Sequence, residues 1–468
     1  MSSDQKNPSK KTKTSKRTDN SADQNKKDRT SVNAITDDFL SEIRSLLFAQ
    51  EETSKVLMAS ADKHLDAFTK FVESFPSVKN DSNRKMIPVE KVEELKRLIH
   101  DLRSSIGSLS LSHRGLFLVL ISKWDAYFGS LLRWIYRVKP EIIDSSARTI
   151  SFTELKQINS VDLARSMIVE DEVSVVLRDS HGDQFDYLER KLNIPLKKLD
   201  IWGKFVELTQ RRNLIAHADG KVSAQYLKVC AENKIEIDAK ITLGSKLEVH
   251  PKYLRESCDC LAELGFKLSQ VLWRKLQPSE AVKAETHLLN TTYEMIKAGQ
   301  HGLAIRILTF SLLPPMKFEE ARDRYVCVVN LALAHKLAGN EDKCVEIIQT
   351  EDWSAARLDL LLAVAVLKDD FNKAVSLMKQ IGTSGEVTKE DYQEWPLFKK
   401  FRTTKRFLDT YREIFKTEIE IRGVPSEVAS ALSLSTELDA LPGKPQSKIK
   451  PKRSKVALKS TSKKKLRL

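Results

Sequence analysis

Apolar residues recur at spacings of three and four along most of the chain, which is the period of an amphipathic helix. The first stripe begins after Thr36, a predicted N-cap, and a second begins after Pro88, with a polar turn between them. The pattern predicts a helical hairpin over residues 33–110. Such a hairpin is either an arm for dimerisation or for a partner, or a pair of extra helices packed on the next domain. The short, interrupted heptad run favours the second.

Longer stripes predict a bundle of four or five helices over residues 111–277. Its penultimate helix runs from Leu199 to His217 and is closed by Asp219-Gly220. The other predicted helices cover about 112–139, 161–177, 184–192 and 252–276. Residues 234–249 show the one strand-like alternation, which predicts a small β-hairpin. The predicted fold class is therefore all-α with a small β-hairpin insertion.

The part of the chain after residue 277 repeats one kind of junction between helices. Three short segments each follow a helical stripe and carry a small residue five positions after a glycine or its equivalent, and these small residues are Ala304, Cys344 and Ala374. The junctions resemble those of tetratricopeptide repeats in a degenerate form, because their offsets are 40 and 30 rather than constant. They predict a helical repeat domain over residues 278–420. One interpretation is that this domain binds a protein or peptide partner. The other is that its helices only pack their own apolar stripes against one another. We favour partner binding, because such solenoids rarely catalyse reactions.

Positive charge is concentrated at the two ends of the chain. Residues 1–30 contribute +5 and residues 442–468 contribute +11 to the net charge of +14, so the rest carries about −2. Both ends have almost nothing to bury, which predicts disordered basic tails over residues 1–32 and 421–468. The tails either attract RNA or another polyanion, or only keep the protein soluble.

Composition and the absence of familiar motifs limit the classes of protein to which the chain can belong. The 41% hydrophobic content is enough for packed cores, no stretch reaches the apolar length of a membrane span, and the N-terminus has no signal-peptide core. We therefore expect a soluble, cytoplasmic protein without membrane association. The five cysteines are expected to be reduced and mostly buried. No His or Cys pairs have zinc-ligand spacing and no nucleotide-binding loop is present, so we expect no metal site and no cofactor.

Arg212, Asn213 and His217 are the candidate site residues. A guanidinium stabilises charge on phosphoryl oxygens and an imidazole accepts the proton of a 2′-hydroxyl, which together meet the needs of RNA cleavage without a metal. On an ideal helix, Asn213 and His217 share one face, whereas Arg212 points about 140° away from His217. Three arrangements remain open: the helix bends, or Arg212 reaches round with its long side chain, or the residues of a second protomer complete the site.

The segment from Arg212 to His217 resembles the Arg-x(4 to 6)-His signature of the HEPN superfamily, in the variant with Asn directly after Arg. Flanking residues that are similar to a bacterial HEPN subgroup are Trp124, Pro140-Glu141, Trp202, Gly220-Lys221-Val222 and Tyr226-Leu227. The resemblance covers residues 112–275, about a third of the chain. It implies a helical bundle and a metal-independent endoribonuclease, commonly a toxin or phage-defence effector, that acts on RNA as a homodimer with a composite site. The alternative is a non-catalytic scaffold that binds RNA or protein.

Overall fold

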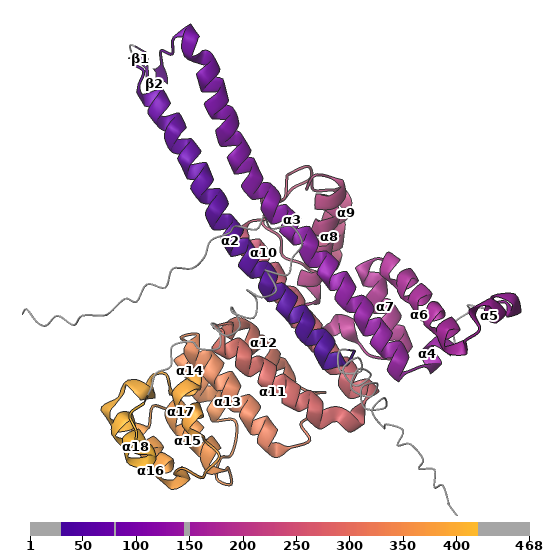
Figure 1. Cartoon of the computed structure of the whole chain (residues 1–468), viewed down its shortest axis with the longest axis vertical. Helices are drawn as coiled ribbons and strands as arrows, with labels where there is room; N and C mark the ends of the chain where they lie inside the picture. The colour runs from indigo at the N-terminus through magenta and orange to yellow at the C-terminus, as the bar shows by residue number, and fades with distance from the viewer. Residues whose placement is uncertain (1–29, 79–80, 145–149, 420–468) are drawn as a thin grey trace, which may run out of the picture. The chain divides into compact units, whose positions relative to one another are not determined.

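The computed structural model describes residues 30–78, 81–144 and 150–419, most of which lie in helices (Figure 1). The prediction of an all-α chain is therefore confirmed. The chain forms two compact units that divide between Gln380 and Ile381. The predicted basic tails lie outside the described residues, apart from Thr30 to Val32.

Two long helices form the first part of the chain and lie side by side (Figure 1). Helix α2 (Val32–Glu73) has 42 residues and α3 (Val92–Val138) has 47, which correspond to lengths of about 63 and 70 Å. The last buried residue of α2 is Ser54 and the first of α3 is His113. Their side chains meet at 2.8 Å between Oγ and Nε2. Beyond this contact, the two helices have no buried side chain and form a two-helix arm.

The arm ends in a small antiparallel sheet rather than in a simple turn. Its strands are β1 (Ser77–Val78) and β2 (Asp81–Lys85), and the short 3-10 helix η1 (Val89–Lys91) then leads into α3. Two details of the sequence prediction for this region were wrong. The N-cap of α2 is Ser31, whereas Thr36 lies within the helix and its buried hydroxyl donates to the Val32 carbonyl at 2.7 Å. The predicted boundary between residues 110 and 111 falls inside α3, which is one continuous helix.

The bundle is built on the second half of α3, the first half of α2 and the long helix α10, which pack on one another. Helix α10 spans Pro251–Leu276. The remaining elements are α4 (Glu141–Asp144), α5 (Phe152–Ile158), α6 (Val161–Arg178), α7 (His181–Leu192), η2 (Leu196–Lys198), α8 (Trp202–His217) and α9 (Ala224–Glu232). Gly265 of α10 allows a close approach to α2, because a Cβ there would lie 2.8 Å from a ring carbon of Phe39. The Tyr127 hydroxyl donates to the Gly265 carbonyl at 2.7 Å and its ring stacks on Phe39. The three longest helices are thus held tightly at one point.

The β-hairpin predicted over residues 234–249 is absent from the structure. The segment forms a single bridge, between Lys221 and Lys246, and otherwise runs as turns and extended chain. Its isoleucines at 235, 237 and 241 pack on a small core cluster that includes Tyr226, Cys230 and Leu247. The alternation therefore reflects one-sided packing on α9 and its surroundings rather than strand pairing.

Three helical pairs follow the bundle in the first unit. They are α11 (Ala281–Lys297) with α12 (His301–Leu312), α13 (Ala321–Leu337) with α14 (Glu341–Ile348), and α15 (Leu358–Leu367) with α16 (Phe371–Ile381), preceded by η3 (Pro278–Glu280). Each pair is joined through one left-handed residue, Gly299, Gly339 or Asp369. In each junction the next amide donates to the carbonyl five residues earlier at 2.8 to 2.9 Å, which is a Schellman closure. The three predicted small residues, at 304, 344 and 374, are all buried.

The second unit, from Ile381 onward, is smaller. Its elements are α17 (Lys389–Glu394), η4 (Pro396–Phe398), η5 (Phe401–Thr403) and α18 (Lys405–Phe415). Aromatic rings fill its core, with Tyr392, Phe398, Phe401, Phe407 and Tyr411 all buried. The repeat domain predicted over residues 278–420 therefore extends across the division between the two units.

One described helical stretch, Val89–Val138, is long and apolar enough to cross a membrane by length and composition, contrary to the expectation that no stretch reaches that length. Half of its most apolar window is buried inside the protein. The apolar side chains of α3, including Phe117, Leu120 and Trp124, pack in the bundle core, so the interior of the protein accounts for much of this apolar character.

Candidate functional site

The three candidate residues lie on the last two turns of α8, whose other face is fixed in the bundle. Phe205, Leu208 and Leu214 are buried, and α8 contacts α3, α9 and α10. Asn213 and His217 are exposed, and Arg212 is partly exposed. Among the described residues, none forms a hydrogen bond or ion pair with the His217 side chain. The imidazole is therefore open to solvent at the end of a packed helix.

Arg212 turns toward Asn213 rather than away from it. Its Nη1 donates to Asn213 Oδ1 at 3.0 Å, and Asn213 is one helical turn before His217. No hydrogen bond or ion pair joins Arg212 to His217 within the described residues, so this contact does not decide between the three arrangements considered from the sequence. Asn213 carries no charge, so this hydrogen bond does not neutralise Arg212. The full positive charge of Arg212 is therefore retained at the surface.

The preceding arginine has a different environment, which sequence reasoning missed. Arg211 Nε donates to Glu207 at 2.7 Å, and its guanidinium lies 3.9 Å from the centre of the Tyr253 ring. The same carboxylate accepts from the hydroxyls of Tyr226 and Tyr253, at 2.8 and 2.7 Å. This cluster of Glu207, Arg211, Tyr226 and Tyr253, here called the Glu207 network, joins α8 to α9 and α10. The only signal in the sequence is the spacing of four between Glu207 and Arg211.

Burial of the Glu207 network makes its tyrosines difficult to ionise. Burial is the largest cause that raises the pKa of Tyr253, and the negative charge of Glu207 raises it further. The pKa of Tyr226 is raised by the same two causes in the same order. Both phenols therefore stay protonated, and remain hydrogen-bond donors, at pH values where an ordinary tyrosine ionises. The network is a permanent brace behind the exposed end of α8.

The chain turns sharply after His217, as the Asp219-Gly220 pair predicted. Both residues are left-handed, with φ of 49° and 78°. A Cβ on Gly220 would lie 2.8 Å from the Leu247 carbonyl oxygen, and the Leu247 amide donates to the Gly220 carbonyl at 2.9 Å. Only glycine fits this approach. The turn fixes the path of the chain directly beyond the candidate site.

Asp219 forms ion pairs with two basic side chains at this turn. Arg114 Nη2 of α3 lies 2.7 Å from one carboxylate oxygen, and Lys246 Nζ lies 2.9 Å from the other. The hydrogen bonds from Lys246 and Arg114, and their positive charges, lower the pKa of Asp219 to about 2. The Asp219 carboxylate is therefore ionised at every pH at which the protein is expected to function.

The described residues contain no group of three or more His, Cys, Asp or Glu side chains placed to hold a metal ion. All five cysteines are free thiols and all are buried, as the sequence predicted. Burial raises the pKa of Cys258 to about 12 and that of Cys344 to about 11. These thiols are therefore protonated side chains of the core.

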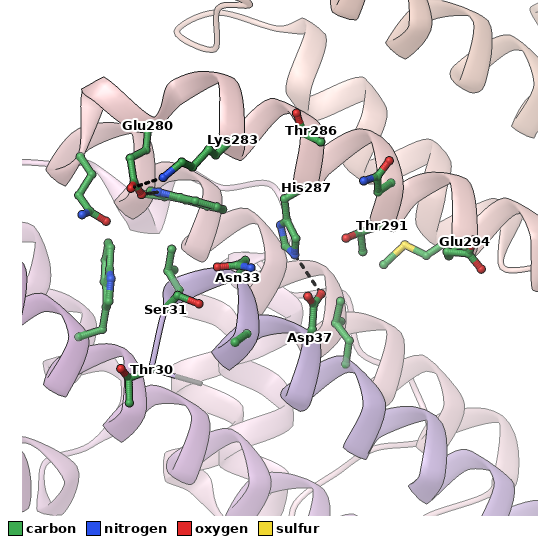
Figure 2. Close-up of a pocket in the computed structure, with 18 of the residues that line it drawn as sticks. Thr30, Ser31, Asn33, Asp37, Glu280, Lys283, Thr286, His287, Thr291 and Glu294 are labelled. Carbon is green, nitrogen blue, oxygen red and sulfur yellow. Dashed lines mark hydrogen bonds and ion pairs between the residues drawn. The ribbon is translucent and has the colours of Figure 1, made fainter. Parts of the chain in front are cut away.

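A cavity with a volume of about 1810 Å³ lies elsewhere, between the start of α2 and α11. Figure 2 shows Asp37 of α2 and His287 of α11 facing each other across it, and Asp37 Oδ1 lies 2.9 Å from His287 Nε2. Four amide side chains also line this cleft and make no hydrogen bond within the described part of the chain: Asn33, Gln277, Asn290 and Gln300. None of Arg212, Asn213 and His217 contributes to it. The α8 site is instead an open surface.

Comparisons of the chain with protein-family models, with curated proteins and with solved structures found no match.

Proposed function

We propose that the protein is a metal-independent endoribonuclease of the HEPN type, acting as a stress, toxin or phage-defence effector. The observation that carries the proposal is the position of the motif at the solvent-facing end of a firmly packed helix. A guanidinium, an amide and an imidazole are accessible there, while the Glu207 network holds the helix behind them. A fixed set of groups around a reacting phosphodiester is what general acid–base and electrostatic catalysis require.

The reaction proposed is intramolecular attack by the RNA 2′-hydroxyl. The 2′-oxygen bonds to phosphorus as its proton leaves, and the bond from phosphorus to the 5′-oxygen breaks as that oxygen gains a proton. His217 is the general base or acid, Arg212 stabilises the charge that develops on the phosphoryl oxygens, and Asn213 orients Arg212. The products are a 2′,3′-cyclic phosphate and a 5′-hydroxyl.

A homodimer is part of the proposal. One proton is removed and one is delivered in each cleavage, and each α8 carries one exposed histidine. A two-fold pairing of motif helices supplies a second imidazole and a second guanidinium, so that the base and the acid are different side chains. Sedimentation of the full chain at micromolar concentration tests the pairing, and a catalytically active monomer would contradict it.

The test of the function is cleavage of total RNA by the purified chain, compared with His217→Ala. Loss of a positioned acid–base group typically costs about 10² to 10⁴ in rate. His100→Ala is the matched control, because His100 is also an exposed helical histidine but lies on the two-helix arm. The wild type should retain activity in excess EDTA and leave cyclic phosphate ends. Equal cleavage by the wild type and His217→Ala would refute the proposal.

The second candidate function is a non-catalytic scaffold, and the cleft of Figure 2 favours it specifically. Amide side chains offer a donor and an acceptor each, which matches the main chain of an extended peptide. The cleft is also balanced in charge, with Asp37, Glu280 and Glu294 against Arg44, Arg137 and Lys283. That balance suits a peptide better than a polyanion such as RNA.

Random-peptide phage display on the full chain tests the scaffold function. Enriched peptides should lose binding to Asn290→Ala, a substitution in the cleft, and keep binding to His217→Ala. If no peptide is enriched, or if enriched peptides bind both variants equally, the cleft is not a peptide site.

A further inference from the structure

Three segments that are far apart in the sequence bring charged side chains together beside His217. Arg114 comes from α3, Lys246 from the chain before α10, and Asp219 from the turn that follows α8. Asp219 accepts from both cations, at 2.7 and 2.9 Å, and lies two positions after His217. Arg114 and Lys246, here called the cation pair, are thereby fixed next to the candidate site.

Stability alone explains the Lys246 contact poorly. The side chain of Asp219 is 62% exposed and that of Lys246 is 45% exposed, and an ion pair this open to water contributes about 0 to 1 kcal/mol. The Arg114 side chain is less open, at 18% exposed. One carboxylate also neutralises only one of the two cations. Lys221 is exposed and pairs with Lys246 through a backbone bridge, which adds a third positive charge. The surface beside His217 is therefore positive, although the chain between the tails carries about −2.

We propose that the cation pair binds an RNA phosphate near the bond on which His217 acts. The inference rests on the proposed ribonuclease function and adds a contact outside the motif. Two residues of chain span at most about 7 Å, so the Cα atoms of His217 and Asp219 are no farther apart than that. The cation pair contacts the Asp219 carboxylate, which places it close enough to His217 to meet a phosphate near the scissile bond.

The chemistry of the cation pair suits a phosphodiester. Arg114 uses Nη2 for Asp219, and its other guanidinium nitrogens make no hydrogen bond within the described residues. Donors of a guanidinium that remain unbonded can bind phosphate oxygens where a phosphate reaches them. Lys246 has three N–H donors, of which Asp219 takes one. Asp219 orients both cations but also weakens their attraction for an anion, so its removal has the opposite effect to theirs.

The experiment measures RNA binding by the full chain carrying His217→Ala, so that a labelled single-stranded RNA is bound without being cleaved. In this background Arg114→Gln and Lys246→Gln should each weaken affinity about two- to fivefold, as expected for one accessible ion pair. Each should also reduce the slope of log affinity against log salt, by at most about 0.7, the value for one phosphate contact on a single strand. Asp219→Asn should tighten binding. The basic tails are present in every variant, so differences between variants report the cation pair alone.

Lys252→Gln is the matched control, because Lys252 is on the next helix, its side chain is 87% exposed and it faces Glu256 at 3.8 Å. Its affinity and salt slope should stay at the parent values. Lys246→Arg keeps the positive charge, so its salt slope should equal that of the parent. A slope that falls in Lys246→Gln but not in Lys246→Arg then reports the lost charge rather than a change in folding. Unchanged slopes in both Arg114→Gln and Lys246→Gln would overturn the inference, even if the wild type cleaves RNA. If the slopes fall as expected but the wild type cleaves no RNA, the cation pair stands as an RNA site and the ribonuclease proposal fails.

Discussion

Removing the Glu207 carboxylate should destabilise the first unit strongly, because one side chain satisfies three donors. Glu207 accepts from Arg211, Tyr226 and Tyr253, all within 2.8 Å. The side chains of Arg211 and Glu207 are only 11% and 12% exposed, so water replaces the lost partner poorly. In Glu207→Ala, the Arg211 charge and two phenol hydroxyls lose their acceptor together.

The size of the effect follows from these contacts. Breaking a buried ion pair from one side costs about 3 to 5 kcal/mol, and a hydrogen bond to a charged group contributes about 1.5 to 3 kcal/mol. These values describe the same carboxylate and are not additive. We expect Glu207→Ala to lower the free energy of unfolding by about 3 to 5 kcal/mol. Glu207→Gln, which keeps an acceptor oxygen, should lose less.

Urea denaturation followed by tryptophan fluorescence measures this change as a shift of the midpoint at constant slope. Glu256→Ala is the control: it removes a glutamate that also pairs with a basic residue four positions away, but both side chains are exposed. Its effect should stay within about 0.5 kcal/mol. If Glu207→Ala and Glu256→Ala shift the midpoint equally, the Glu207 network does not brace α8 and the reasoning is refuted.

Three further predictions concern other parts of the chain. Burial, followed by the charge of His250, lowers the pKa of His113 below 6.5, so the folded state should lose stability as pH falls from 6.5 through the lowered pKa; His113→Asn should reduce this loss in urea denaturation at pH 7.5 and 5.5. Gly265→Ala should lower the free energy of unfolding by about 1 to 3 kcal/mol, because its Cβ meets Phe39; an unchanged midpoint would show that the helices can separate at no cost. Deleting residues 1–30 and 442–468 should flatten the salt dependence of RNA binding, and an unchanged slope would assign that binding to the folded chain.

Helices were predictable where the apolar period was regular. The closing helix of the bundle was predicted over residues 252–276 and is observed as Pro251–Leu276. The boundary near residue 110 was less predictable, because serines and glycines interrupt the stripe there. Such residues weaken a helix without ending it when no proline is present. Gly107 and Gly115 have open space around them, so the helix continues past both without close contacts.

The exposed motif could be located from the sequence, but its surroundings could not. The positions of Arg212, Asn213 and His217 along one helix follow from the helical period alone. The partners of Glu207 and Asp219 come from helices and loops up to more than a hundred residues away, as with Arg114 and Asp219. A periodic pattern fixes which face of a helix is buried, and it does not specify which side chain of another element lies against that face. The prediction of a β-hairpin after residue 233 was wrong for the same reason. One-sided packing on α9 produces the same alternation of apolar and polar residues as a strand in a sheet.

The two neighbouring arginines of α8 have opposite surroundings, and this decides which of them is available for chemistry. The Arg211 guanidinium is occupied on its face by the Tyr253 ring and on its edge by Glu207. Arg212 has one neutral acceptor, Asn213 Oδ1, and lies partly in solvent. A phosphate oxygen carries a charge and forms a stronger hydrogen bond with a guanidinium than an amide oxygen does. A phosphodiester beside His217 could therefore displace Asn213 from Arg212, whereas displacing Glu207 from Arg211 would leave a buried carboxylate without its cation. The sequence places both arginines next to each other, and only their contacts separate the one that holds the helix from the one that is left for the proposed chemistry.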